Sequence, residues 1–141
     1  MDRLSGTSDD DTLQGKKLDD TYVFTTGFGA DKVIELANEG KDTIDLSGVT
    51  SAITITLGGD GKLKEITSGA SPVNSIKGQS GGNIANVEII KGGAGTTTLD
   101  LSAYNSPLTV NVRRVNSDNN VIVKDAGGVE LLTAQNVTNI K

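Results

Sequence analysis

The sequence predicts an all-β protein, and a right-handed parallel β-solenoid is the expected architecture. A phrase occurs twice without a gap: Asp42–Leu57 reads DTIDLSGVTSAITITL, and Thr97–Val112 reads TTLDLSAYNSPLTVNV, at an offset of 55 residues (97 − 42). Apolar residues alternate with polar ones near both ends of this phrase, which is typical of strands buried on one face. A unit that recurs at a fixed long spacing is typical of stacked units. An antiparallel β-sandwich, in which each copy supplies hairpins, is the alternative.

The composition favours many short strands over a helical core. At 141 residues the chain is expected to form a single domain, residues 1–141, that buries roughly two thirds of its unfolded surface. It contains 18 glycines, and only 3% of its residues are aromatic, a mixture that suits short strands closed by tight turns. There is no cysteine, so disulfides and thiol chemistry are excluded.

The negative charge is concentrated in the first third of the chain. The formal net charge is −5; residues 1–45 contain 11 acidic and 5 basic side chains, whereas residues 46–141 contain 7 acidic and 8 basic ones. An acidic N-terminal third argues against nucleic acid and anionic membranes as partners and favours a cation. No apolar run approaches the ~18 residues needed to cross a bilayer, so no membrane span is expected.

Residues 6–45 consist of four degenerate nine-residue units. The units are GTSDDDTLQ (6–14), GKKLDDTYV (15–23), TGFGADKVI (26–34) and ANEGKDTID (37–45). The sixth place of each unit is aspartate, and these residues are Asp11, Asp20, Asp31 and Asp42. The eighth place is apolar, and these residues are Leu13, Tyr22, Val33 and Ile44. The pattern predicts a Gly/Asp-rich turn followed by a very short strand with one inward-pointing apolar side chain.

These units resemble the hemolysin-type calcium-binding repeat G-G-x-G-x-D-x-U-x of the repeats-in-toxin (RTX) family. The words DDTYVFTTGFGADKVIE and DTIDLSG are also similar to segments of large secreted bacterial adhesins and of serralysin-type C-terminal domains. The resemblance implies a right-handed β-roll wound around calcium ions. It also implies a bacterial protein exported by the type I route, located at the cell surface or in the extracellular medium.

In that family, aspartates from units two apart share a calcium ion. Carried over to this chain, the resemblance pairs Asp11 with Asp31 and Asp20 with Asp42. Backbone carbonyls near three turn glycines would complete the cage, at Gly27, Gly29 and Gly40. The alternative is that these aspartates cap turns, because an aspartate side chain accepts backbone N–H bonds there.

The first two units depart from the family pattern at a place where glycine is normally required. The fourth-place glycine is replaced by Asp9 in the first unit and by Leu18 in the second, while Gly29 and Gly40 keep it in the third and fourth. That place normally needs a positive φ, which a β-carbon penalises. The sequence therefore predicts that Asp31 and Asp42 are the best calcium ligands and that the turn at residues 15–18 is not a normal metal-binding turn.

The rest of the chain consists of two internal repeats, residues 42–91 and 97–141. Asn86-Val87 and Ile90-Lys91 recur as Asn136-Val137 and Ile140-Lys141, at an offset of 50 residues (136 − 86). Within the first copy, residues 62–67 and 83–91 are predicted to be strands. Ser68–Gly82 is rich in Ser, Gly and Asn and is predicted to be the longest loop.

The sequence carries no catalytic signature. It has no histidine, no G-x-S-x-G elbow, no phosphate loop and no zinc-ligand spacing. Asp45 and Asp100 recur in D-L-S, but a duplicated position usually marks architecture. We therefore expect a non-enzyme, namely a structural or adhesive repeat module that contacts neighbouring repeats and meets a cell surface or an extracellular polysaccharide. The alternative is an accessory C-terminal domain of a secreted enzyme, serving secretion, folding or carbohydrate binding.

Overall fold

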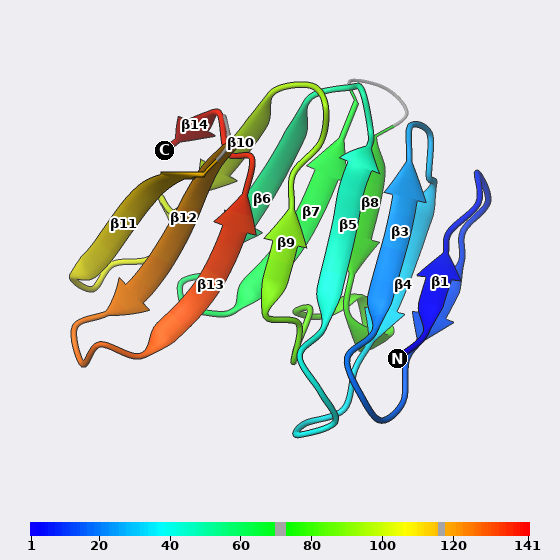
Figure 1. Cartoon of the computed structure of the whole chain (residues 1–141), viewed down its shortest axis with the longest axis horizontal. Coiled ribbons are helices and arrows are strands. Elements are labelled where there is room, and N and C mark those ends of the chain that lie inside the picture. Colours follow the sequence, from blue (N-terminus) through cyan, green and yellow to red (C-terminus); the bar gives the residue numbers. More distant parts are fainter. Residues whose placement is uncertain (70–72, 116–117) are drawn as a thin grey trace.

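The protein is built from two seven-stranded β-sheets, which confirms the all-β prediction (Figure 1). The computed structural model describes residues 1–69, 73–115 and 118–141. The strands of sheet A, in spatial order, are β1 (Arg3–Ser5), β3 (Thr21–Thr25), β5 (Thr43–Gly48), β9 (Ile89–Lys91), β13 (Glu130–Gln135), β12 (Asp118–Asp125) and β11 (Leu108–Val115). The strands of sheet B are β14 (Asn139–Ile140), β10 (Thr97–Asp100), β6 (Ile53–Leu57), β7 (Leu63–Ser68), β8 (Asn74–Lys77), β4 (Ala30–Ile34) and β2 (Thr12–Gln14).

Most neighbouring strands are parallel. The antiparallel pairs are confined to two meanders, β6–β7–β8 in sheet B and β11–β12–β13 in sheet A. The remaining strand pairs are all parallel. An antiparallel β-sandwich, the alternative from the sequence, is therefore wrong for most of the strand pairs. A uniformly parallel stack is interrupted only where the meanders lie.

The nine-residue units alternate between the two sheets. β1, β3 and β5 lie side by side in sheet A, whereas β2 and β4 lie in sheet B. The eighth-place residues consequently stack on their counterparts two units away: Leu13 lies opposite Val33, and Tyr22 lies opposite Ile44. Each unit supplies one short strand, but β3 and β5 each bury a second apolar side chain, Phe24 and Leu46, so the prediction of one inward apolar residue per strand is too few for these two strands.

The two internal repeats follow the same path but begin in opposite sheets. In the first copy the chain runs from β5 in sheet A through the meander β6–β7–β8 in sheet B and returns as β9 beside β5. In the second copy it runs from β10 in sheet B through the meander β11–β12–β13 in sheet A and returns as β14 beside β10. The recurring phrase therefore starts in sheet A on its first occurrence and in sheet B on its second.

Equivalent residues of the two copies make the same contacts. The Nζ of Lys91 lies 3.8 Å from Asp45 Oδ2, and the Nζ of Lys141 lies 3.5 Å from Asp100 Oδ2. In both D-L-S phrases the aspartate Oδ1 accepts the backbone N–H two residues later, at 2.9 and 3.0 Å. These carboxylates are thus used by the fold itself, as the duplicated position indicated. The pKa of Asp45 and of Asp100 is lowered by their bonds to the following serines and by the nearby lysines, although burial opposes this at Asp45.

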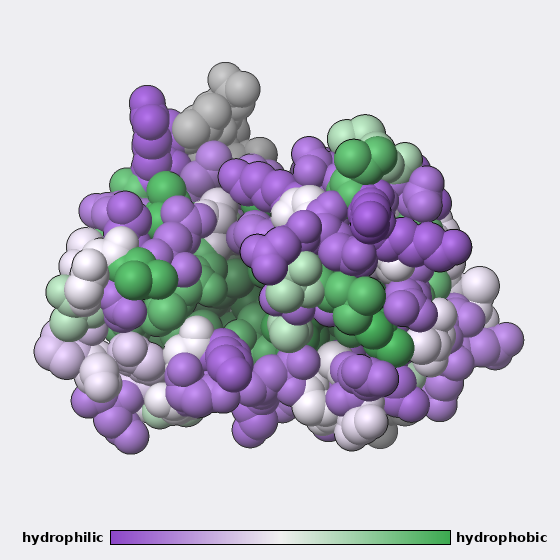
Figure 2. All heavy atoms as spheres, turned by 90° about the horizontal axis from the view of Figure 1, so that it is seen from below, coloured by the Kyte–Doolittle hydropathy of each residue, from purple (hydrophilic) through white to green (hydrophobic). Residues whose placement is uncertain are grey.

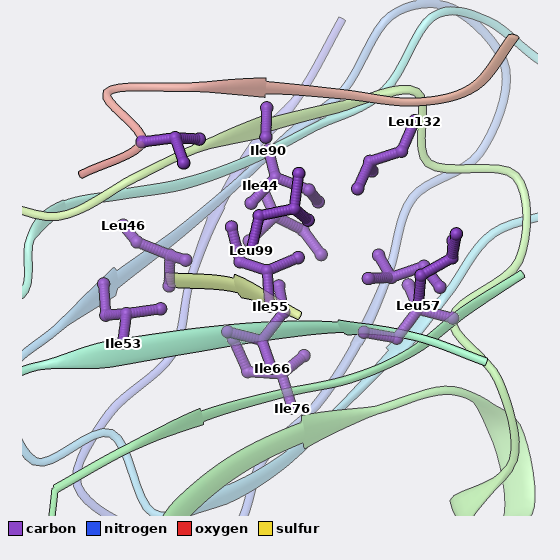
Figure 3. Packing of buried hydrophobic residues seen from close by; sticks show 14 of the residues in the cluster. Ile44, Leu46, Ile53, Ile55, Leu57, Ile66, Ile76, Ile90, Leu99 and Leu132 are labelled. Atoms are coloured by element: carbon purple, nitrogen blue, oxygen red, sulfur yellow. The ribbon is translucent and has the colours of Figure 1, made fainter. Parts of the chain in front are cut away.

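The core lies between the two sheets. Ile44 and Ile90 point from sheet A towards Ile55, Ile66 and Ile76 of sheet B (Figure 3). All of these side chains are completely buried. Full burial of an aliphatic side chain of this size contributes about 1.5–3 kcal/mol. Apolar packing therefore holds the two sheets together in the middle of the molecule.

The structure contains a strand where the sequence predicts a loop. β8 and the short 3₁₀-helix η1 (Gln79–Gly81) lie within the predicted loop Ser68–Gly82, whose residues 70–72 are outside the described part. β8 forms because Ile76 is buried opposite Ile66 of β7, and because the other edge of the strand pairs with β4. Among the described residues no helix is long and apolar enough to span a membrane.

The face at which β3, β5, β9 and β13 begin is mostly hydrophilic and has an apolar hollow (Figure 2). A groove at this end is lined by residues of both internal repeats, including Leu63, Ile84 and Val87 from the first and Leu131 from the second. It follows the junction at which β13 of the second copy pairs with β9 of the first. Val87 and Leu131 pack against the central core.

Candidate metal centre

Three buried carboxylates converge at one end of the N-terminal units. Asp20, Glu35 and Asp42 each place one carboxylate oxygen within 4.8 Å of the other two. Asp20 immediately precedes β3, Asp42 immediately precedes β5, and Glu35 immediately follows β4. All three side chains are buried. A cluster of this kind could hold a metal ion.

The strand pattern explains why these residues meet. Alternate positions in β4 and directly after it are occupied by Asp31, Val33 and Glu35. These side chains therefore share the face that is buried against sheet A. In sheet A, Thr21 lies opposite Thr43, which brings the preceding Asp20 and Asp42 side by side at the start of their strands. The end of β4 and the starts of β3 and β5 lie at the same edge of the molecule (Figure 1).

Hydrogen bonds fix two of the three carboxylates in place. Asp20 Oδ2 accepts the backbone N–H of Lys16 at 3.0 Å, and its Oδ1 accepts the N–H of Asp2. Asp42 Oδ1 accepts the N–H of Asp20 at 2.8 Å. These bonds hold Asp20 and Asp42 in a fixed relation while leaving other lone pairs available, since each carboxylate oxygen can accept more than one bond.

Glu35 is held on one side only. Its Oε1 accepts the hydroxyl of Tyr22, and the Tyr22 oxygen in turn accepts the N–H of Gly15 at 2.6 Å. The Oε2 atom is buried and has no hydrogen-bond partner among the described residues. A β-carbon at Gly15 would overlap Glu35 Oε1 and would lie 2.6 Å from Asp20 Oδ2. Gly15 therefore leaves the space in which these oxygens approach one another.

The cluster carries more negative charge than its surroundings neutralise. Burial raises the pKa of Glu35 and of Asp42, and neighbouring carboxylates raise both further. The N–H of Lys16 lowers the pKa of Asp20, whose Oδ1 also lies 3.8 Å from the N-terminal ammonium of Met1. Burial and the bond to Glu35 raise the pKa of Tyr22, which therefore stays protonated and acts as a donor. A proton or a bound cation must offset the remaining charge.

The predicted aspartate pairs are neighbours in the structure, but they touch through the backbone. The N–H of Asp11 donates to Asp31 Oδ1 at 2.7 Å, and the N–H of Asp20 donates to Asp42 Oδ1. The N–H of Asp42 donates in the same way to Glu88 Oε2 at 2.7 Å. Each carboxylate thus caps the strand beside it, which is the turn-capping role that the sequence left open as the alternative.

Asp11 and Asp31 lie near the starts of β2 and β4, at the opposite ends of the strands from the triad. Asp31 is buried at the start of β4, and its Oδ2 has no partner among the described residues. Burial raises the pKa of Asp31 to about 6. Bonds from Thr7 lower the pKa of Asp11. The carbonyl of Gly29, predicted as a ligand, accepts the N–H of Ser75 at 2.9 Å.

The turn predicted to be abnormal contains a residue in the left-handed region. Leu18 has φ +81°, as its place in the unit predicts, and Gly29 at the equivalent place has φ +82°. Gly40 does not adopt a positive φ; a β-carbon there would instead lie 2.5 Å from the carbonyl carbon of Leu18. Gly40 is therefore required by the close approach of another turn, not by its own conformation.

Sequence reasoning missed Glu35 and Tyr22 as members of the cluster. The signal was present, because Glu35 continues the alternation of Asp31 and Val33 and so belongs to the inward face of β4. The unit pattern predicts Tyr22 only as an inward apolar residue and indicates no partner for its hydroxyl.

The cluster offers only oxygen donors, which suit hard cations such as calcium and magnesium. Imidazole and thiolate ligands are excluded because the sequence contains neither histidine nor cysteine. Comparison of the chain with protein-family models, with curated proteins and with solved structures finds no match. The chemistry of Asp20, Glu35 and Asp42 is accordingly the guide to what this end of the molecule does.

Proposed function

We propose that this chain is a non-catalytic structural repeat module of a secreted RTX-type protein, whose stacked strands form a parallel β-solenoid stabilised by calcium. The alternation of β1 to β5 between two sheets, one strand per nine-residue unit, supports the solenoid. Repetition of one path by the two later copies supports a module that grows by adding similar units. The choice of calcium as the ion and the extracellular location are taken from the resemblance to the RTX family.

The observation that carries the calcium proposal is the Glu35 carboxylate, which contributes one oxygen to the triad and whose Oε2 is buried without a hydrogen-bond partner among the described residues. A buried carboxylate oxygen without a donor is costly, because it has lost its water without gaining a replacement. Calcium takes six to eight oxygens at about 2.3–2.6 Å and would bind the Glu35 carboxylate together with oxygens of Asp20 and Asp42. The ion would also neutralise the charge that raises the pKa of Glu35 and Asp42.

The same site explains how calcium could act as a folding signal after export. Without the ion, repulsion among the three carboxylates would oppose the close approach of the starts of β3 and β5 and the end of β4. With the ion, the strands of both sheets are joined through one group of ligands, so binding energy adds to folding energy. The middle of the molecule does not depend on the ion, because its core is apolar.

Calcium should raise the melting temperature of the wild-type chain relative to a sample in chelator. At a free calcium concentration of 100 times Kd the stabilisation is about 2.7 kcal/mol, or roughly 5–10 °C for a chain of this size. Glu35→Gln should abolish this increment, and titration calorimetry should show the loss of one bound ion per chain.

The matched control is Glu130→Gln, which removes a carboxylate on the exposed start of β13 and should leave the calcium increment unchanged. Identical melts of the wild type with and without calcium would remove the metal from this proposal. An increment that survives Glu35→Gln but is lost in Asp31→Ala would place the ion at the opposite edge, beside Asp11.

A further inference from the structure

The open side of β11 is an edge strand whose apolar face is not covered. β11 is the last strand of sheet A, and no strand among the described residues pairs with its outer side. Val112 is 57% exposed, and Val110 is also exposed. Both lie opposite buried residues of β12, Val121 and Val123. Residues directly opposite one another in an antiparallel pair share a face, so the two exposed valines belong to the face that elsewhere forms the core.

The first copy shows what covers this face. By the repeat offset, Val110 and Val112 correspond to Ile55 and Leu57 of β6, and Leu57 is 0% exposed. The difference is that β6 has a parallel neighbour, β10, on its outer side. Leu99 of that strand lies opposite Ile55. β10 is the first strand of the second copy, so the first copy is completed by the copy that follows it.

The path of the meanders turns the equivalent edge outward in both copies. In the first copy β7 and β8 fold back towards β4, and the outer side of β6 receives β10. In the second copy β12 and β13 fold back towards β9, and the outer side of β11 is free. The backbone N–H of Ile53 donates to the carbonyl of Thr96 at 2.8 Å in the first copy, and the N–H of Leu108 occupies the equivalent place in the second.

The edge of sheet B gives the same result independently. β14 is the last strand of sheet B, and its Ile140 is 43% exposed. The equivalent residue of the first copy is Ile90, which is 0% exposed because β13 of the second copy pairs beside it. Both open strands at this end of the molecule therefore expose apolar residues whose counterparts are buried by the following copy.

We propose that the edges of β11 and β14 form a docking surface for one further copy of the same repeat. Its first strand, of the type Thr97–Leu101, pairs in parallel with β11, and the last strand of its meander pairs with β14. Its first leucine contacts Val110, as Leu99 contacts Ile55. This rests on the proposed function as a repeat module, but it uses contacts at the other end of the molecule from the metal centre.

The test is to extend the chain by a repeat of residues 92–141 after Lys141, which includes the linker that joins the two existing copies. The natural chain has no cysteine, so Val112→Cys introduces a single thiol on the proposed surface. The thiol should react with a disulfide reagent on the order of 100-fold more slowly in the extended chain, because reaction then requires local opening. Val129→Cys is the matched control, since Val129 is 60% exposed in a turn away from this edge; its reactivity should not change.

In a second control, the added repeat has aspartate in place of the residues that correspond to Leu99 and Leu101. In this extended chain the thiol at position 112 should stay as reactive as in the unextended chain. Unchanged reactivity in the intact extended chain overturns the proposal. Protection that depends on protein concentration in the unextended chain also overturns it, because a second molecule would then occupy the edge. Loss of the calcium response leaves this result unaffected, so failure of the metal proposal and failure of this one are distinguishable.

Discussion

Replacing Asp31 by asparagine should stabilise the protein at neutral pH. The Asp31 carboxylate is buried at the start of β4, where its Oδ1 accepts the N–H of Asp11 at 2.7 Å. Its Oδ2 has no partner among the described residues. Burial raises its pKa to about 6, and the negative charges of Asp11 and Asp10 add to this effect. Asparagine keeps an acceptor for the N–H of Asp11 and removes the charge.

The magnitude follows from the difference between the folded and unfolded pKa. A pKa raised from 3.8 to about 6 corresponds to about 3 kcal/mol, since each pKa unit is worth about 1.4 kcal/mol. This is an upper limit, because solvent penetration and local relaxation screen part of it. We expect a gain of about 1–2 kcal/mol for Asp31→Asn at pH 7.5.

The sign of the pH dependence is fixed by which state holds the proton more tightly. Between pH 3.8 and about 6 the folded state keeps the proton on Asp31 and the unfolded state does not, so stability falls as the pH rises. Below pH 3.8 the wild type and Asp31→Asn should be nearly equal in stability. The advantage of the variant should grow through this window and be complete above pH 6.

Urea denaturation in chelator at pH 3.5, 5 and 7.5 measures the free energy of unfolding of both proteins. Asp11→Asn is the control with the opposite sign. The pKa of Asp11 is lowered by its bonds from Thr7, so the Asp11 carboxylate stabilises the folded state above pH 3.8, and this stabilisation is lost as the pH falls. A clear loss of stability in Asp31→Asn at pH 7.5 would refute the reasoning. It would mean that the Asp31 carboxylate is ionised and satisfied in the folded protein.

Two further predictions concern the backbone and the core. Leu18→Gly should raise stability by about 0.5–1 kcal/mol, since it relieves roughly 1–2 kcal/mol of left-handed strain at φ +81° and loses up to about 1 kcal/mol to chain entropy; a lower melting temperature would contradict this. Ile55→Ala should cost about 2–5 kcal/mol in urea denaturation, whereas Val110→Ala, at the equivalent but exposed place, should cost less than about 1 kcal/mol. Equal costs would show that the β11 edge is already covered.

Local alternation in the sequence was sufficient to find the strands that bury one regular face. The phrase ITITL forms β6, with Ile53, Ile55 and Leu57 inward, because each apolar residue has a neighbour of the same kind two places away. β8 was missed for the converse reason. Its sequence NSIK has one apolar residue, Ile76, so no period is visible, and only pairing with β7 and β4 makes it a strand.

The metal centre was predictable only in part because it joins both sheets. Asp20 and Asp42 occupy equivalent places in units two apart, so their proximity follows from the nine-residue spacing once strands are stacked. Glu35 comes from the other sheet, and no spacing within one sheet relates it to them. Its inward direction follows from alternation with Val33, but its meeting with Asp42 depends on how the two sheets face each other.

The number of strands in each meander explains why a largely parallel architecture survives two antiparallel insertions. When the chain leaves sheet A, crosses sheet B in a single strand and returns, it arrives at the end of sheet A where the previous strand began. The next strand of sheet A is then parallel to the previous one. Three strands in the other sheet return the chain to the same end, whereas two strands would make the next strand antiparallel. β9 is parallel to β5 and β14 is parallel to β10, so each meander must contain an odd number of strands, as both do. The sequence predicts two strands before the loop Ser68–Gly82, in the alternating phrase that ends at Leu57 and at residues 62–67, and one strand after it at residues 83–91, of which only Ile89–Lys91 is a strand in the structure. That even number before the loop was itself a sign that a strand was missing from the predicted loop Ser68–Gly82, and β8 is that strand.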